Sequence, residues 1–221
     1  MDPNVAMVSA YVRPPLPSQV FHEADGTPFV YGERWGCGDP PEESYSRVSH
    51  PERFAPLHDV ADALVEHLAN TYDVQVREGD GPGENRGAVV RRACVLTPAS
   101  AAAAPLTLLW TDHPSVVLRA GLLAEDISPA CGCDACDEPL EAQVEDLEEY
   151  VLGVAAGHLT EWVRGRVTWV GFRLEAVDGH RSGESRSDMS SAAVRDARHR
   201  LAALPAGRWQ PWPLKDRLTE P

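Results

Sequence analysis

Three cysteines within six residues form the part of this 221-residue chain that is best suited to chemistry. They are Cys131, Cys133 and Cys136, in the run CGCDACDE that spans residues 131–138. The last two have the C-x-x-C spacing of a metal knuckle, and a set of soft thiolates selects zinc among the common metals. We therefore expect the run to hold one zinc ion, which ties together the preceding strand, the following helix and the N-terminal segment.

A structural zinc site takes four ligands, and the run offers three thiols. Cys37 lies between two glycines in the N-terminal segment and is the expected fourth ligand if that segment folds back onto the body. A nearby histidine, or the carboxylate of Asp134 or Asp137, is the alternative. The remaining cysteine, Cys94, lies in an apolar run and is expected in the core.

The spacing leaves other interpretations open because the chain has a single C-x-x-C step, whereas strong zinc signatures have two. The three thiols could be reduced structural groups or form a disulfide. A thiol-redox role would suit a C-x-x-C step at the start of a helix, but Asp134, Asp137 and Glu138 oppose formation of the thiolate. A metal-dependent enzyme would keep the fourth position open and use Asp134 or Glu138 as its base.

No other catalytic pattern is present in the sequence. The eight histidines form neither an H-x-x-x-H nor an H-E-x-x-H pattern, and there is no G-x-S-x-G, P-loop or dinucleotide fingerprint. We assign no catalytic and no cofactor-binding residue. The expected function is a non-enzymatic interaction or accessory protein stabilised by zinc, with the metal-dependent enzyme and the thiol-redox protein as alternatives.

The elements that would position the cysteines follow from periodicity. Gly- and polar-rich segments at 79–87 and 179–186 are expected to be loops. Short links between successive strands favour antiparallel pairing. The sequence thus predicts an α+β fold, an antiparallel sheet of about five strands covered by three helices. The expected helices are 57–72, 139–164 and 188–204, and the expected strands are 74–77, 88–96, 106–111, 116–122 and 167–174.

Residues 1–56 differ from the rest, because nine prolines disfavour long helices and central strands there. Their many aromatic residues are untypical of a disordered tail. We expect an extended arm packed on a single α+β domain, 57–221. Within the arm, 19–21 and 28–31 are expected to form a small hairpin, and Ser49 and Glu52 a capping box.

The net charge is −14, from 20 basic and 34 acidic residues. Such a balance argues against nucleic-acid binding, which needs a basic surface. Eight of the acids lie between residues 131 and 150, where there is no Lys or Arg, so the cysteines should adjoin an acidic face that meets a partner or a cation. With no recognisable secretory signal or membrane span, we expect a cytoplasmic protein with no membrane or nucleic-acid partner; a protein partner and a homo-oligomer stay open.

Several runs resemble an actinobacterial family known only as a domain of unknown function. They are Tyr31–Gly36, Ser46–Val48 with His50–Leu57, Leu118–Gly121 and the CGCDACDE run. The resemblance covers residues 15–175 and implies a single cytosolic domain from a high-GC actinobacterium, consistent with the use of Arg rather than Lys. It implies no activity. It also implies that the three clustered cysteines are typical, whereas the position of Cys37 often holds another residue.

Overall fold

The computed structural model describes residues 10–81, 83–85, 87–165, 169–176 and 179–216. Its main element is an antiparallel sheet in the order β3-β5-β6-β7-β8, with the short β4 (Glu84–Asn85) paired to β5. The five strands are β3 (Val74–Asp80), β5 (Ala88–Pro98), β6 (Leu106–Thr111), β7 (Val116–Ala120) and β8 (Ala124–Ser128). The predicted α+β fold with a five-stranded antiparallel sheet is therefore confirmed.

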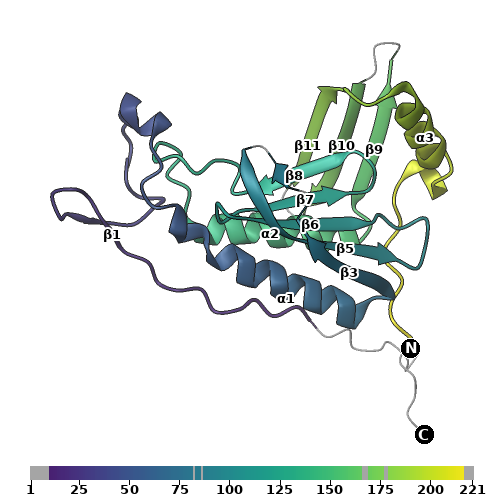
Figure 1. The fold of residues 1–221 in the computed structure, drawn as a ribbon, viewed down its shortest axis with the longest axis horizontal. Coiled ribbons are helices and arrows are strands. Elements are labelled where there is room, and N and C mark those ends of the chain that lie inside the picture. The colour runs from purple at the N-terminus through teal and green to yellow at the C-terminus, as the bar shows by residue number, and fades with distance from the viewer. Residues whose placement is uncertain (1–9, 82, 86, 166–168, 177–178, 217–221) are drawn as a thin grey trace, which may run out of the picture.

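Two helices, α1 (Pro56–Thr71) and α2 (Leu140–Ala155), pack on each other and on this sheet (Figure 1). Their apolar stripes meet the inward side chains of β5, β6 and β7 in one core. Cys94 is fully buried in it, as expected for a thiol that behaves as a small hydrophobe. The burial of apolar surface holds these layers together, because each Å² removed from water contributes about 25 cal/mol of free energy.

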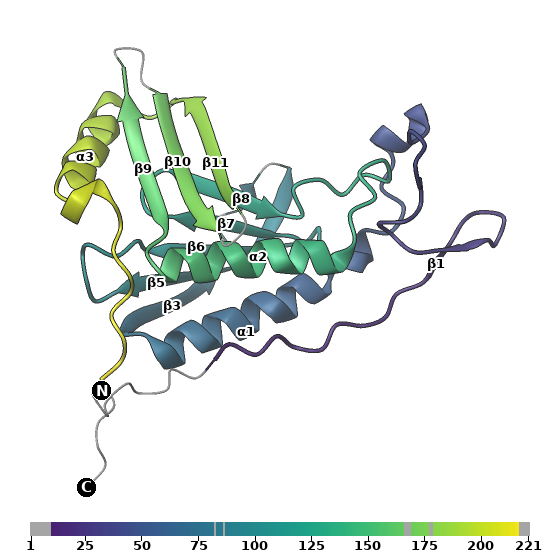
Figure 2. The same cartoon turned by 180° about the vertical axis from the view of Figure 1, so that it is seen from behind.

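A second antiparallel sheet, in the order β11-β10-β9, stands beside the first (Figure 2). Its strands are β9 (Leu159–Arg164), β10 (Trp169–Ala176) and β11 (Gly179–Arg186). Helix α2 contacts both sheets, through β8 and β10. Helix α3 (Ser191–Ala202) packs against β9, and the 3₁₀ turn η3 (Pro205–Gly207) follows it.

Four expectations about secondary structure need correction. The segment 79–87, expected as a loop, contains the end of β3 at residues 79 and 80 and the short strand β4. The helix expected at 139–164 ends at Ala155, and the last six residues of that range form strand β9. The segment 179–186, expected as a loop, is strand β11, because its polar side chains lie on an exposed edge strand that pairs with β10. The main sheet takes its fifth strand from 124–128, which was not predicted, whereas the predicted strand at 167–174 belongs to the second sheet, with residues 167 and 168 outside the described part.

The described part of the N-terminal arm runs across both helices before it reaches α1. Near its start, Tyr11 packs edge-on against His67 of α1, and Arg13 forms a two-pronged ion pair with Glu148 of α2. The expected hairpin is present as β1 (Phe21–His22) and β2 (Pro28–Phe29). Two 3₁₀ turns, η1 (Glu42–Ser46) and η2 (Pro51–Phe54), lead into α1.

No helix in the described part of the chain has the length and apolar character needed to cross a bilayer.

Candidate metal centre at the cysteine loop

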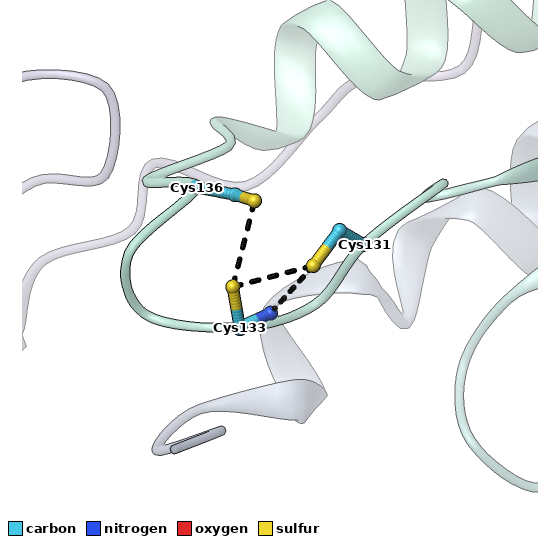
Figure 3. Close-up of side chains that lie close together, drawn as sticks. All are labelled: Cys131, Cys133 and Cys136. Carbon is cyan, nitrogen blue, oxygen red and sulfur yellow. Dashed lines mark hydrogen bonds between the residues drawn. The ribbon is translucent and has the colours of Figure 1, made fainter. Parts of the chain in front are cut away.

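The segment 131–138, here called the cysteine loop, connects β8 to α2 and brings three of the four predicted ligands together. The Sγ atoms of Cys131 and Cys133 are 3.3 Å apart, those of Cys133 and Cys136 are 3.4 Å apart, and all three lie within 4.8 Å of one another (Figure 3). Thiolates bound to one zinc at about 2.3 Å in tetrahedral geometry sit about 3.8 Å apart. The three sulfur atoms are therefore close enough to bind one metal ion.

The pKa values of Cys133 and Cys136 are shifted in opposite directions. Burial opposes ionisation of Cys133, but hydrogen bonds with the Cys131 thiol and from the Cys136 backbone lower its pKa overall. Partial burial and the two neighbouring thiols raise the pKa of Cys136 to about 12. A cation bound at the three sulfurs would stabilise the thiolate form of Cys136, because a thiol that coordinates a metal ion loses its proton.

The backbone of the loop also suits metal binding. The amide of Cys133 points at Sγ of Cys131 at 3.4 Å, so a thiolate there would be stabilised by a backbone donor. Two carboxylate oxygens of the loop, Oδ1 of Asp137 and Oε2 of Glu138, are buried and have no hydrogen-bond partner among the described residues. The donor set and these unpaired buried oxygens both fit a site that takes a cation.

Cys37, the predicted fourth ligand, is exposed and is not a member of this sulfur group. It lies on the arm two residues beyond Trp35, whose indole donates to the Asp134 carbonyl at 3.1 Å. The arm therefore runs beside the cysteine loop. That Cys37 completes the site stays a prediction.

Asp134 has a different role from the predicted ones of ligand or base. Its carboxylate is fully buried and receives the Ser49 hydroxyl at 2.6 Å, the Ser49 amide at 2.9 Å and the Arg47 guanidinium at 2.8 Å. Burial disfavours its charge, but these donors, with Arg34 nearby, hold its pKa at about 2. Because its oxygens are occupied by the arm, Asp134 is a fastening point rather than a free ligand.

Further hydrogen bonds fasten the arm to the loop on either side of Asp134. The amides of Asp134 and Ala135 donate to the Arg47 and Ser44 carbonyls, and the Arg34 amide donates to Asp137 Oδ2 at 2.8 Å. Ser49 is thus used by Asp134, which explains why the expected capping box does not form: η2 has His50 at its N-cap and no side-chain cap. The sequence pattern was right about a turn and wrong about what Ser49 binds.

Arg53 lies against the loop and was not singled out from the sequence. Its side chain is 1% exposed, donates to the carbonyls of His50 and Gly132, and lies over the rings of Tyr31 and Phe54. Burial lowers the pKa of Arg53, while Asp134, Glu138 and Asp137 favour its charged form. Its positive charge offsets the acids of the loop. The sequence offered one indication of this role. Arg53 lies in the aromatic-rich arm, which was expected to pack on the body that carries the acidic cysteine loop.

The predicted acidic face is smaller than the sequence count implied. Of the eight acids between 131 and 150, Asp134, Asp146 and Glu148 pair with arginines from the arm or from β11. Three of the others, Glu141, Glu145 and Glu149, are exposed at four-residue spacing along α2. This row is the solvent-facing remainder of the acidic segment.

Comparison with known proteins gives one match. The model of a family described as "Family of unknown function (DUF6226)" matches residues 17–216. No curated protein and no solved structure matches the chain. The matched region extends past residue 175, where the resemblance seen in the sequence ended, and takes in α3 and most of the C-terminal tail.

Proposed function

The chain belongs to this family of unknown function, and we propose that it is a cytoplasmic, non-enzymatic interaction or accessory protein whose cysteine loop binds one zinc ion. The observation that carries the proposal is the group of three sulfur atoms within 4.8 Å at the loop that also holds the arm. Zinc would supply folding energy there, because a loop with three thiols and several buried acids has little apolar surface of its own to bury.

The proposed metal ligands and the residue that holds the arm are neighbours in the sequence. Asp134 lies between Cys133 and Cys136, and its carboxylate holds Ser49 and Arg47 of the arm. A metal that fixes the two cysteines fixes the carboxylate between them. The proposed role of zinc is therefore to keep residues 31–53 attached to the body. Cys37, on the same stretch of the arm, is the proposed fourth ligand.

The proposed partner surface is the row formed by Glu141, Glu145 and Glu149 on α2, beside the cysteine loop. A surface with one sign of charge attracts a partner segment of the opposite sign, and such association weakens as salt rises. The proposed partner is a protein with a basic segment.

Metal content tests the zinc proposal. Protein made without a histidine tag and without added metal should contain about one equivalent of zinc per chain. Cys131→Ser, Cys133→Ser and Cys136→Ser should each lose it, whereas Cys94→Ala, which removes the buried core thiol, should keep it. Cys37→Ser tests the fourth ligand by the loss of one thiolate from the spectrum of the cobalt-substituted protein. Less than about 0.2 equivalents of any metal, with the fold intact in chelator, would overturn the proposal.

A metal-dependent enzyme is the second candidate, and the buried, unpaired Oε2 of Glu138 favours it. Burial raises the pKa of Glu138, as is common for carboxyl groups that move protons. An open coordination position separates the two candidates. In the cobalt-substituted protein, azide or cyanide should leave the visible spectrum unchanged if four protein ligands close the site. A spectrum that shifts with the added anion would instead support the enzyme.

A further inference from the structure

A second site lies far along the chain from the cysteine loop, between the β5–β6 connection and the end of α3. It is a cavity of about 670 Å³ that is open to solvent. Cavities of roughly 300–1,000 Å³ with mostly apolar walls are typical sites for small ligands. The residues that matter most to its chemistry are Ala101, Ala103, His199, Arg200, Leu204 and Trp209.

The cavity results from small side chains held in place by hydrogen bonds. Most of the residues that the β5–β6 connection contributes to the cavity wall are alanines, whose side chains are single methyl groups. The C-terminal tail pairs with this connection, because the Gln210 amide donates to the Ala102 carbonyl at 2.9 Å. Trp209, which is 2% exposed, is fixed by its hydrogen bond to Glu161 at 2.8 Å. The walls are thus preformed, so a ligand would not have to order them.

Two basic side chains line this apolar cavity without a partner. His199 and Arg200 are exposed, and neither side chain has a hydrogen bond or an ion pair with any residue in the described part of the chain. Other exposed arginines, such as Arg77 and Arg195, also lack an ion pair with the described residues, but neither of those two lines the cavity. Eight other arginines lie within 4 Å of a carboxylate, namely Arg13, Arg34, Arg47, Arg91, Arg92, Arg119, Arg173 and Arg181.

We propose that this cavity binds a small amphipathic carboxylate, with its apolar group against Leu204 and Trp209 and its head group on Arg200. A guanidinium presents parallel N–H donors that match the two oxygens of a carboxylate, and such charge-assisted pairs are stronger than neutral hydrogen bonds. His199, the preceding residue of α3, is also exposed and lines the cavity, so it can add a second donor. This site is independent of the metal and of the function proposed above.

Three probes with one alkyl chain and different head groups test the proposal by calorimetry on the full chain: octanoate, 1-octanol and octylammonium. Octanoate should bind with one-to-one stoichiometry, about tenfold or more tighter than 1-octanol, and octylammonium should bind most weakly. Arg200→Ala should weaken octanoate about tenfold and leave 1-octanol unchanged. Arg195→Ala, an exposed arginine of the same helix that does not line the cavity, is the matched control and should bind as the original protein does.

A blocking variant tests the location. Ala203→Trp places a large side chain at an exposed wall position, and it should abolish binding of both octanoate and 1-octanol while the melting temperature stays within a few degrees. The absence of saturable octanoate binding, equal binding of octanoate and octylammonium, or unchanged affinity in Arg200→Ala would each overturn the proposal.

Discussion

The carboxylate of Glu161 in β9 accepts a hydrogen bond from the indole nitrogen of Trp209 at 2.8 Å, so the second sheet and the C-terminal tail share one buried charge. The same carboxylate accepts the amides of Leu122, Leu123 and Ala124, at the turn between β7 and β8. One side chain therefore joins both sheets and the tail. Burial raises the pKa of Glu161, and the four N–H donors oppose that rise.

Removing this acceptor should destabilise the fold. Glu161→Ala leaves four donors with no partner. Each buried group left unpaired costs about 1–3 kcal/mol, so we expect the free energy of unfolding to fall by about 4 kcal/mol or more. Urea denaturation measures it. Glu141→Gln, an exposed acid of α2, is the control and should change the free energy by less than about 0.5 kcal/mol. Similar values for the two variants would contradict this role for Glu161.

Gly121 is required for the approach of Glu161 to the turn. Its φ of +61° lies in the left-handed region, and a Cβ there would stand 2.2 Å from Oε2 of Glu161. Gly121→Ala should cost clearly more than the roughly 1–2 kcal/mol of left-handed strain alone. Gly26→Ala is the matched control, because φ is +86° and a Cβ would meet nothing within 4 Å. Equal losses of unfolding free energy would show that the contact with Glu161 has no effect.

Stability should fall in mild acid because of His58. Burial lowers the pKa of His58 below the ordinary value, and the positive charge of Arg92 lowers it further. A hydrogen bond with the Ser115 carbonyl and the nearby Asp62 act in the opposite direction but do not cancel the effect of burial. The unfolded chain therefore takes up a proton near pH 6.5 before the folded one does, and the unfolding free energy decreases as pH falls from there towards the folded pKa.

His58→Asn removes this titration. The stability advantage of the original protein over the variant should be largest above pH 7 and shrink between pH 6.5 and pH 5, by at most about 1.4 kcal/mol per pH unit. Urea denaturation at constant ionic strength gives both curves. A gap that stays constant with pH would refute the assignment to His58.

Asp134→Asn should loosen the arm without unfolding the core. The amide keeps one acceptor oxygen but loses the negative charge that Arg47 and Arg34 face. A hydrogen bond to a charged group contributes about 1.5–3 kcal/mol, so the attachment of the arm should weaken by about that amount. Hydrogen exchange followed by mass spectrometry should show faster exchange in residues 31–49 and unchanged exchange in α1 and β6. Uniform acceleration across the chain would instead mean that Asp134 supports the whole fold.

Four strands of the main sheet and α1 could be predicted because their apolar residues repeat at strand or helix spacing and face one core. The strand at the end of the predicted 139–164 helix could not be predicted, because Leu159 and Trp162 fit a helical stripe as well as a strand. The deciding feature is Gly157, whose φ of +78° ends the helix and whose Cβ would meet the Pro211 backbone of a distant tail. Local periodicity carries no information about that contact.

The cysteine loop could be predicted as a unit because its spacing is local. The attachment of the arm could not, because Asp134 meets Ser49 and Tyr31 only through the tertiary fold. From the sequence, Asp134 was one acid among eight. Its burial and its pairing with arginines separate it from the exposed row on α2.

The path of the arm has a kinetic consequence. Arg13 meets Glu148 across 135 residues of chain, and Tyr31 meets Asp134 across 103. Contacts between residues so far apart in sequence form slowly, because a long loop must close before they contribute. The strands of the main sheet pair with neighbours that are much closer in the sequence. We therefore expect the sheet and helices to fold first and the arm to pack onto them in a late step. Substitutions at its contacts should then speed unfolding while leaving the folding rate nearly unchanged.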